Sequence, residues 1–173
     1  MAGALKSNFT PRTLNMPANP ADVASIDAII TAAYDSISGP AGQKRDWARE
    51  RSLFYPGARL IPTAKPDESN NLAPEMLDVD GFIARVEPYF AEHGFYEKEI
   101  ARRTEQFGQI AHVWSTYESR HRGDDPKPFM RGINSIQLFY DGSRWWIVTI
   151  YWQQESLSIQ FQTDISEQNV PSC

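Results

Sequence analysis

Thiols and paired histidines are scarce in this sequence, which limits the metal and redox chemistry it can perform. The single cysteine, Cys173, is the last residue, so neither a disulfide within the chain nor a thiolate metal cluster can form. The three histidines, His93, His112 and His121, form no HExxH motif and no other pair at ligand spacing. We therefore expect no metal site and no cofactor.

Long hydrophobic runs and nucleotide-binding motifs are also absent. No segment approaches the ~20 apolar residues that cross a bilayer, and the N-terminal stretch lacks the apolar run of a signal peptide. The motifs GxSxG, GxxxxGK and GxGxxG do not occur. The 22 acidic residues outnumber the 17 basic ones, which are scattered among them. These features predict a cytoplasmic protein with no nucleic-acid or membrane partner.

The length of 173 residues fits one domain with a single core. We expect that domain to span residues 19–155, after a flexible leader at residues 1–18 and before an irregular tail at residues 156–173. Residues 62–74 are rich in Pro, Asn, Asp and Ser, which is typical of a long loop and makes this segment a candidate lid.

Helical spacing dominates the first half of the chain. Apolar residues at three- and four-residue steps predict a helix from Asn19 to Ile37 and another from Gln43 to Phe54. A third helix is expected to begin at Asp80. It contains Pro88, which lacks the amide proton that the helix needs and predicts a kink or a break into two pieces.

Strand patterns dominate the second half. Residues 95–105 and 109–120 predict one hairpin, and residues 131–154 predict another that turns at Asp141-Gly142. Helices followed by antiparallel strands are typical of the α+β class, not of an alternating parallel sheet.

Several phrases in this order resemble the nuclear-transport-factor-2-like superfamily, which includes polyketide cyclase-like, ketosteroid isomerase-like and scytalone dehydratase-like proteins. The resemblance covers about residues 20 to 155 and rests on four stretches of sequence: Ala33-Tyr34-Asp35, Arg45-Asp46-Trp47 with Leu53-Phe54-Tyr55-Pro56, Ala111-His112-Val113, and Asp141-Gly142-Ser143-Arg144-Trp145-Trp146-Ile147-Val148.

The resemblance implies a cone, in which a strongly curved antiparallel sheet wraps around N-terminal helices and encloses a cavity. It also implies pocket roles for Tyr34 and Asp35, because scytalone dehydratase-like members use a tyrosine and an aspartate of the first helix. Those members use two pocket histidines, whereas only His112 is suitably placed here. Members of the superfamily include enzymes, ligand binders and assembly modules, so the fold transfers better than any activity.

The candidate catalytic residues are His112, Asp35 and Tyr34. His112 lies on a predicted strand among apolar neighbours, where an imidazole can act as an acid or base near neutral pH. The alternative is a histidine hydrogen-bonded in a core or a subunit interface. The glutamates of the strands neighbour arginines and lysines, so we interpret them as a salt-bridged, solvated face; they are Glu97, Glu99, Glu105 and Glu118.

Aromatic side chains are expected to line the cavity together with one polar tip, and would suit a small hydrophobic or aromatic molecule. The predicted ligand-binding residues are Trp47, Phe54, Tyr55, Trp114, Asn134 and Tyr151. The alternative is that the aromatic residues form an ordinary core.

The last hairpin is apolar on both faces, which a sheet with one solvated face would not be. Pairing Tyr140 with Trp145 divides the hairpin into two sets of residues. The resemblance implies that the first Trp and Ile of the W-x-I phrase face inward, which assigns this set to the cavity: Ile136, Leu138, Tyr140, Trp145, Ile147 and Tyr151. The other set, with Ile133, is expected to form the interface of a homodimer: Ser135, Gln137, Phe139, Trp146, Val148, Ile150 and Trp152. The alternative cover is the tail, residues 157–170. A one-residue shift in register would exchange the two sets.

Two functions remain open at this point. The first is a small-molecule pocket protein, as a lyase, isomerase or cyclase, with His112 as the acid or base. The second is a non-catalytic dimeric module that binds a ligand or a protein without transforming it.

Overall fold

The computed structural model describes residues 17–63, 73–156 and 159–160. Almost all of the predicted leader and tail, and most of the loop at residues 62–74, lie outside the described residues. None of the described helices is long and apolar enough to cross a membrane.

The described residues form four helices, and each begins at a side chain that accepts a backbone hydrogen bond. The predicted helix from Asn19 to Ile37 is two helices, α1 (Pro20–Val23) and α2 (Ile26–Ile37). Ser25 Oγ accepts a hydrogen bond from the Ala28 amide at 3.1 Å and so starts a new helix inside the predicted one. The apolar spacing continues across this break, which is why the sequence pattern concealed it.

The other two helices are α3 (Trp47–Leu53) and α4 (Val79–Glu92). Asp46 caps α3, and Asp78 caps α4 by accepting from the Gly81 amide at 2.7 Å. The start predicted at Asp80 is therefore two residues too late. α4 continues through Pro88 as one element, so the break into two pieces does not occur.

The strands are β1 (Phe54–Pro62), β2 (Tyr96–Phe107), β3 (Ile110–Arg120), β4 (Met130–Tyr140) and β5 (Trp145–Gln154). They form one sheet in the order β1-β5-β4-β3-β2. Consecutive strands from β2 to β5 are antiparallel, as predicted, whereas β1 pairs with β5 in parallel. The predicted hairpin turn is correct, since Tyr140 pairs with Trp145 and Gly142 has a φ of +100°.

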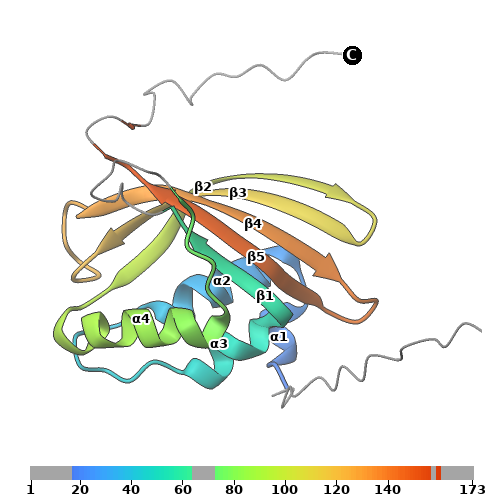
Figure 1. Ribbon diagram of the computed structural model, residues 1–173, viewed down its shortest axis with the longest axis horizontal. Helices are drawn as coiled ribbons and strands as arrows, with labels where there is room; N and C mark the ends of the chain where they lie inside the picture. The colour runs from blue at the N-terminus through green and yellow to red at the C-terminus, as the bar shows by residue number, and fades with distance from the viewer. Residues whose placement is uncertain (1–16, 64–72, 157–158, 161–173) are drawn as a thin grey trace, which may run out of the picture.

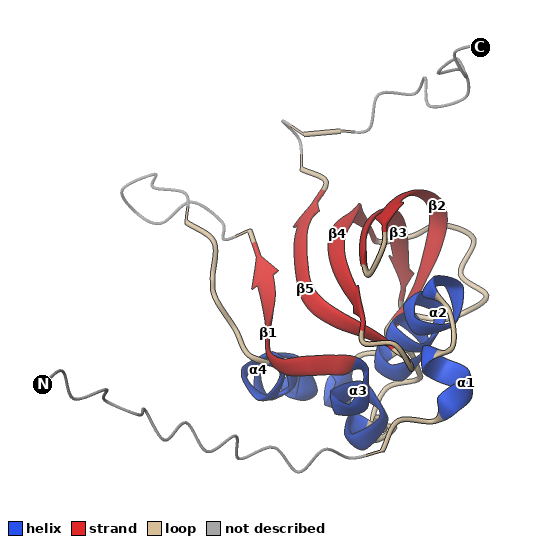
Figure 2. Ribbon diagram, turned by 90° about the vertical axis from the view of Figure 1, so that its right-hand side faces the viewer, coloured by secondary structure: helices blue, strands red, loops and turns tan. Residues whose placement is uncertain are grey.

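The helices lie against one face of the sheet, which curves around them (Figures 1 and 2). The core lies between these layers and includes Ile29 and Ile30 of α2, Leu53 of α3, and Val113 and Ile147 of the sheet, each at most 1% exposed. No helix of the described part covers the opposite, outer face. The predicted α+β cone is confirmed.

A β-bulge in β5 divides the last hairpin into two differently oriented halves. Leu138 pairs with Ile147 but Gln137 pairs with Thr149, so Val148 is an extra residue in β5. Before the bulge the predicted faces hold, with Trp145 and Ile147 buried on the helix side. Beyond it the alternation is reversed. A one-residue shift therefore exchanges the predicted faces, but only in the second half of β5.

Candidate functional site

A cavity of about 620 Å³ lies between the helices and the concave face of the sheet. This volume is within the range of small-molecule sites. Side chains of α2, α4 and the sheet form its walls, which are mainly apolar. The apolar lining includes Ile37, Phe82, Val86, Ile136, Ile150 and Trp152.

Polar groups gather at one part of the wall. The Tyr34 hydroxyl lies 2.7 Å from Ser115 Oγ, and Asn134 Nδ2 donates to the same hydroxyl at 3.0 Å. The Asn134 amide also donates to Glu97 Oε1 at 3.4 Å, and Ser119 Oγ donates to Glu97 Oε2 at 2.9 Å. Tyr34, Asn134 and Glu97 all line the cavity. We call these three residues, with Ser115 and Ser119, the polar cluster.

Burial raises the pKa values of the acidic groups in the polar cluster. Burial raises the pKa of Glu97 to about 7, and the hydrogen bonds from Ser119 and Asn134 offset only part of this effect. Burial also raises the pKa of Tyr34 and of Tyr117, and the nearby Glu97 raises both further. A carboxyl with a pKa near 7 can hold or accept a proton at neutral pH, which suits acid-base chemistry.

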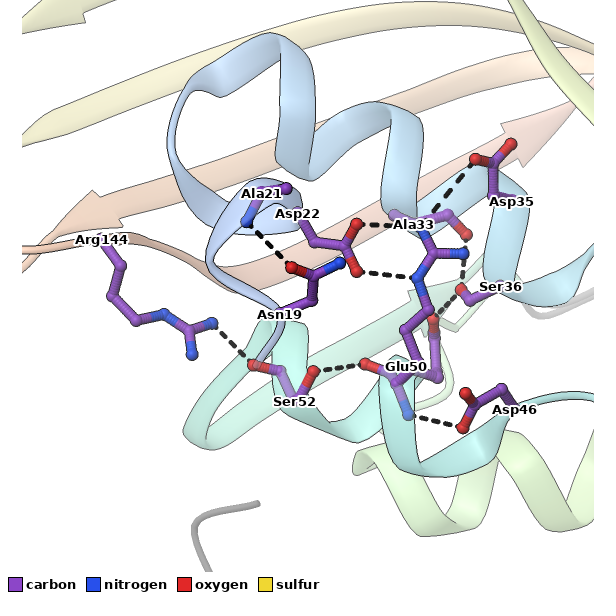
Figure 3. A network of polar contacts seen from close by, with 11 residues as sticks. Asn19, Ala21, Asp22, Ala33, Asp35, Ser36, Asp46, Glu50, Ser52 and Arg144 are labelled. Carbon is purple, nitrogen blue, oxygen red and sulfur yellow. Dashed lines mark hydrogen bonds and ion pairs between the residues drawn. The ribbon is translucent and has the colours of Figure 1, made fainter. Parts of the chain in front are cut away.

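A second carboxyl reaches the same cavity from α3. Glu50 is 2% exposed, lines the cavity and accepts a hydrogen bond from Ser36 of α2 (Figure 3). Burial raises the pKa of Glu50 to about 7, while the Ser36 hydroxyl and the charge of Arg49 lower it in part. Arg49 itself is held by Asp22 through a bond of 2.7 Å. The cavity therefore contains two carboxyl groups whose charged forms are disfavoured.

The interpretation of all the strand glutamates as a solvated, salt-bridged face is wrong for Glu97. Within the described residues Glu97 has no ion pair, and it points inward between Ser119 and Asn134. Glu99 does pair with Arg102, and Glu118 with Arg120 and Lys98, although both carboxyls are largely buried. The sequence contained a hint of this arrangement, because Glu97 and Glu99 are two residues apart and therefore lie on the same face of β2.

The three candidate catalytic residues are not brought together. Tyr34 faces the cavity, but His112 lies on the outer face of β3, where its Nε2 is 3.0 Å from Ser135 Oγ. The Asp35 side chain is 60% exposed, and its carboxylate lies 3.9 Å from Arg49. A catalytic unit of His112 and Asp35 in the cavity is therefore wrong, because α2 and β3 present these side chains in different directions.

None of the five predicted ligand-binding aromatic residues lines the cavity. Trp47 stacks on Phe90 and donates to Glu87, and Phe54 is buried in the core. The remaining three, Tyr55, Trp114 and Tyr151, are each 44% exposed on the outer side, where the β5 bulge places Tyr151. Only Asn134 of the predicted set lines the cavity.

The predicted interface set is also divided. Ile150 and Trp152 line the cavity. The Trp152 ring meets the Phe82 ring edge to face, with 6.0 Å between the ring centroids. Their assignment to the outer face is wrong because of the extra residue at Val148. Trp146 is on the outer face but only 7% exposed, since it donates to Asp141 at 2.7 Å and lies under Arg144 at 3.6 Å. Ser135, Gln137 and Phe139 pair with outward residues of β3.

The fold is that of several solved structures with low sequence identity. An NTF2-like protein of unknown function from Pseudomonas putida KT2440 is 10% identical with a TM-score of 0.57, and the match covers 87% of this chain and 99% of that one. A similar protein from Silicibacter pomeroyi DSS-3 is 18% identical with a TM-score of 0.51, covering 76% and 94%. LinA is 9% identical with a TM-score of 0.56, covering 77% and 85%.

No protein-family model and no curated protein matches the sequence. The shared architecture is the NTF2-like cone, an α+β fold with a curved sheet around its helices. The chain has this fold, as the resemblance predicted. At these identities the likeness extends to the fold alone.

Proposed function

We propose that this protein binds a small, largely apolar molecule in the cone cavity and that Glu97 transfers a proton to or from it. The observation that carries the proposal is a single cavity that combines apolar walls with a buried carboxyl whose pKa is raised to about 7. Tyr34 and Asn134 would orient the polar part of the ligand beside that carboxyl. A lyase, isomerase or cyclase reaction is consistent with this arrangement, with Glu97 in the role first given to His112.

Binding is tested by thermal denaturation with a panel of planar apolar compounds. A ligand at about 100 times its Kd stabilises a protein by roughly 2.7 kcal/mol, which corresponds to an increase of about 5–10 °C in Tm for a chain of this size. Val86→Phe should abolish the shift because Val86 lines the cavity. Ile133→Phe is the control, since it enlarges a side chain on the outer face.

Chemistry is tested with any compound that is turned over. Glu97→Gln should lower kcat by about 10² to 10⁴, and the activity of the parent protein should change through an apparent pKa near 7. Turnover unaffected by Glu97→Gln would leave the non-catalytic module as the better description. If no compound raised the Tm and a crystal structure showed the cavity filled by side chains, the binding proposal would be wrong.

We also propose a homodimer through the outer sheet face. This is supported by the exposed Trp114, Tyr151 and Ile110, and by the lack of a covering helix within the described residues. Trp146 contributes less than the sequence suggested, because Arg144 and Tyr55 already cover it. The predicted alternative cover, residues 157–170, lies almost entirely outside the described residues.

Light scattering of the double variant Trp114→Glu, Tyr151→Glu checks the dimer. The parent protein is expected to have the mass of two chains at micromolar concentration, and the variant the mass of one, because two carboxylates would be buried without partners. Met76→Glu is the control, because it introduces the same charge outside the sheet at a side chain that is 61% exposed. A parent protein that is monomeric in this range would contradict the proposal.

A further inference from the structure

The hydrogen bonds of the polar cluster fix the direction in which its protons point. Arg102 holds Glu99 through bonds of 2.9 and 2.6 Å, so Glu99 is an acceptor. Ser115 Oγ donates its single proton to Glu99 at 2.5 Å. The Tyr34 hydroxyl must then donate to Ser115, because Ser115 has no second proton. The proton of Tyr34 is thus directed away from the cavity.

The same count leaves Asn134 without a free donor. Its amide nitrogen carries two protons, and it donates to the Tyr34 oxygen at 3.0 Å and to Glu97 at 3.4 Å. Ser119 donates to the other oxygen of Glu97. When Glu97 is ionised, what the cluster still offers a ligand is a set of acceptors: a lone pair of Tyr34, the amide oxygen of Asn134 and the carboxylate oxygens of Glu97.

The charged side chains around the cavity also favour a ligand that carries a positive charge. Glu50 and Glu97 both line it, and Arg85 is the one basic side chain among the described lining residues. Arg85 is half exposed and forms an ion pair with Glu75, which is also half exposed and lines the cavity. The two inner carboxyls therefore have no cation inside the cavity to balance their ionised forms.

Tyr117 places a further hydroxyl on the wall of the cavity. It is 2% exposed and lines the cavity, and its hydroxyl makes no hydrogen bond within the part of the chain that is described. This hydroxyl is open to the cavity, where its oxygen can accept a hydrogen bond from a ligand and its proton can be donated to one.

We propose that the ligand of this cavity is an apolar molecule that carries a protonated amine. The N–H groups of the ammonium donate to Glu97, to the Tyr34 oxygen and to the Asn134 amide oxygen, while the apolar body packs against Phe82, Ile150 and Trp152. This inference rests on the proposed function, since it names the class of ligand for the same cavity. A cation beside Glu97 also favours its ionised form, which is the form that acts as a base.

Three probes with the same aromatic body test the charge preference by calorimetry at pH 7. They are 2-(1-naphthyl)ethylamine, which is cationic at this pH, 2-(1-naphthyl)ethanol, which is neutral, and 1-naphthaleneacetic acid, which is anionic. The amine should bind at least tenfold more tightly than the alcohol, and the acid should show no binding. At pH 6.5 the amine should also release protons, seen as different heats in buffers of different ionisation enthalpy, because Glu97 loses its proton to the buffer.

Single substitutions identify which carboxyl groups cause the preference for the amine. Glu97→Gln should weaken amine binding tenfold or more and change alcohol binding by less than twofold, and Glu50→Gln should weaken amine binding by a smaller factor. Glu105→Gln makes the same chemical change on the outer face of β2, so the affinities for the amine and for the alcohol should both stay unchanged.

Alcohol or acid binding as tight as that of the amine would overturn the amine preference and leave the proposed cavity function standing. Amine binding that is unchanged in both Glu97→Gln and Glu50→Gln would overturn the placement of the ammonium. If none of the three probes binds, both the inference and the proposed binding function are contradicted.

Discussion

The free energy of unfolding is expected to fall by about 2–3 kcal/mol between pH 5 and pH 8 on account of Glu50 alone. Its pKa is raised from 4.5 to about 7 by burial in the folded protein. In this interval the folded state keeps a proton that the unfolded state has already released, so rising pH favours unfolding. Above pH 7 the buried carboxyl ionises in the folded state and the loss levels off.

Other groups modify this profile in known directions. Glu97 adds to the fall, because burial raises its pKa in the same way. Glu118 acts oppositely, since its hydrogen bond with Arg120 lowers its pKa. Its contribution to stability is already present above pH 5 and is lost only at lower pH. The decline between pH 5 and pH 8 therefore reports on the two cavity carboxyls.

Urea unfolding of Glu50→Gln across this pH range is the measurement. Glutamine keeps the shape and can still accept from Ser36, but it cannot ionise, so the variant should be more stable than the parent at pH 8 and similar at pH 5. Glu105→Gln, at an exposed ion pair, should keep the slope of the parent protein. An equally steep decline in Glu50→Gln would show that Glu50 is not the source.

Replacing Arg45 by lysine is expected to lower the free energy of unfolding by about 3–5 kcal/mol. Arg45 is 5% exposed, and its guanidinium donates to four carbonyl oxygens, those of Ile37, Pro40, Gln43 and Gly39. It also lies 5.0 Å from the centre of the Phe90 ring. An ammonium group cannot reproduce the planar arrangement of donors, so buried carbonyls would lose their partners.

The consequence for the site follows from the position of Arg45. It joins the end of α2 to the start of α3, and both Ile37 and Phe90, which it contacts, line the cavity. Urea unfolding with an unchanged m-value would identify the effect as lost stability. Arg51→Lys is the control, because Arg51 forms an exposed ion pair with Asp80 and should cost less than about 1 kcal/mol. A loss below 1 kcal/mol for Arg45→Lys would contradict the expectation.

The two cavity carboxyls carry a cost in stability that an ordinary core would avoid. Glutamine at position 50 or 97 would fill the same space without a group to desolvate on ionisation. Groups that oppose local stability are most often found where a protein binds or reacts, because there the cost is recovered when the ligand arrives. The pH profile and the proposed amine therefore concern the same feature of the molecule.

The sequence alone determined that helices come first and indicated the order of the four strands from β2 to β5. The apolar spacing of the helices, the alternation of the strands and the turn at Asp141-Gly142 are local patterns, and they indicated the α+β class, whereas the cone was implied by the resemblance to a known superfamily. They missed the helix start at Ser25, since a cap is a single side chain within an uninterrupted apolar stripe.

Only the tertiary structure decided which side chains meet. One unpaired residue, Val148, turns Ile150 and Trp152 into the cavity and Tyr151 out of it, and no local preference of the strand reveals such a bulge. The sequence neighbours of Glu97 suggested that water and basic side chains would surround its carboxyl group. In the folded protein Ser119 of β3 and Asn134 of β4 donate hydrogen bonds to it instead, and it faces the cavity. A strand pattern determines which residues alternate, but register and pairing determine which face is inside.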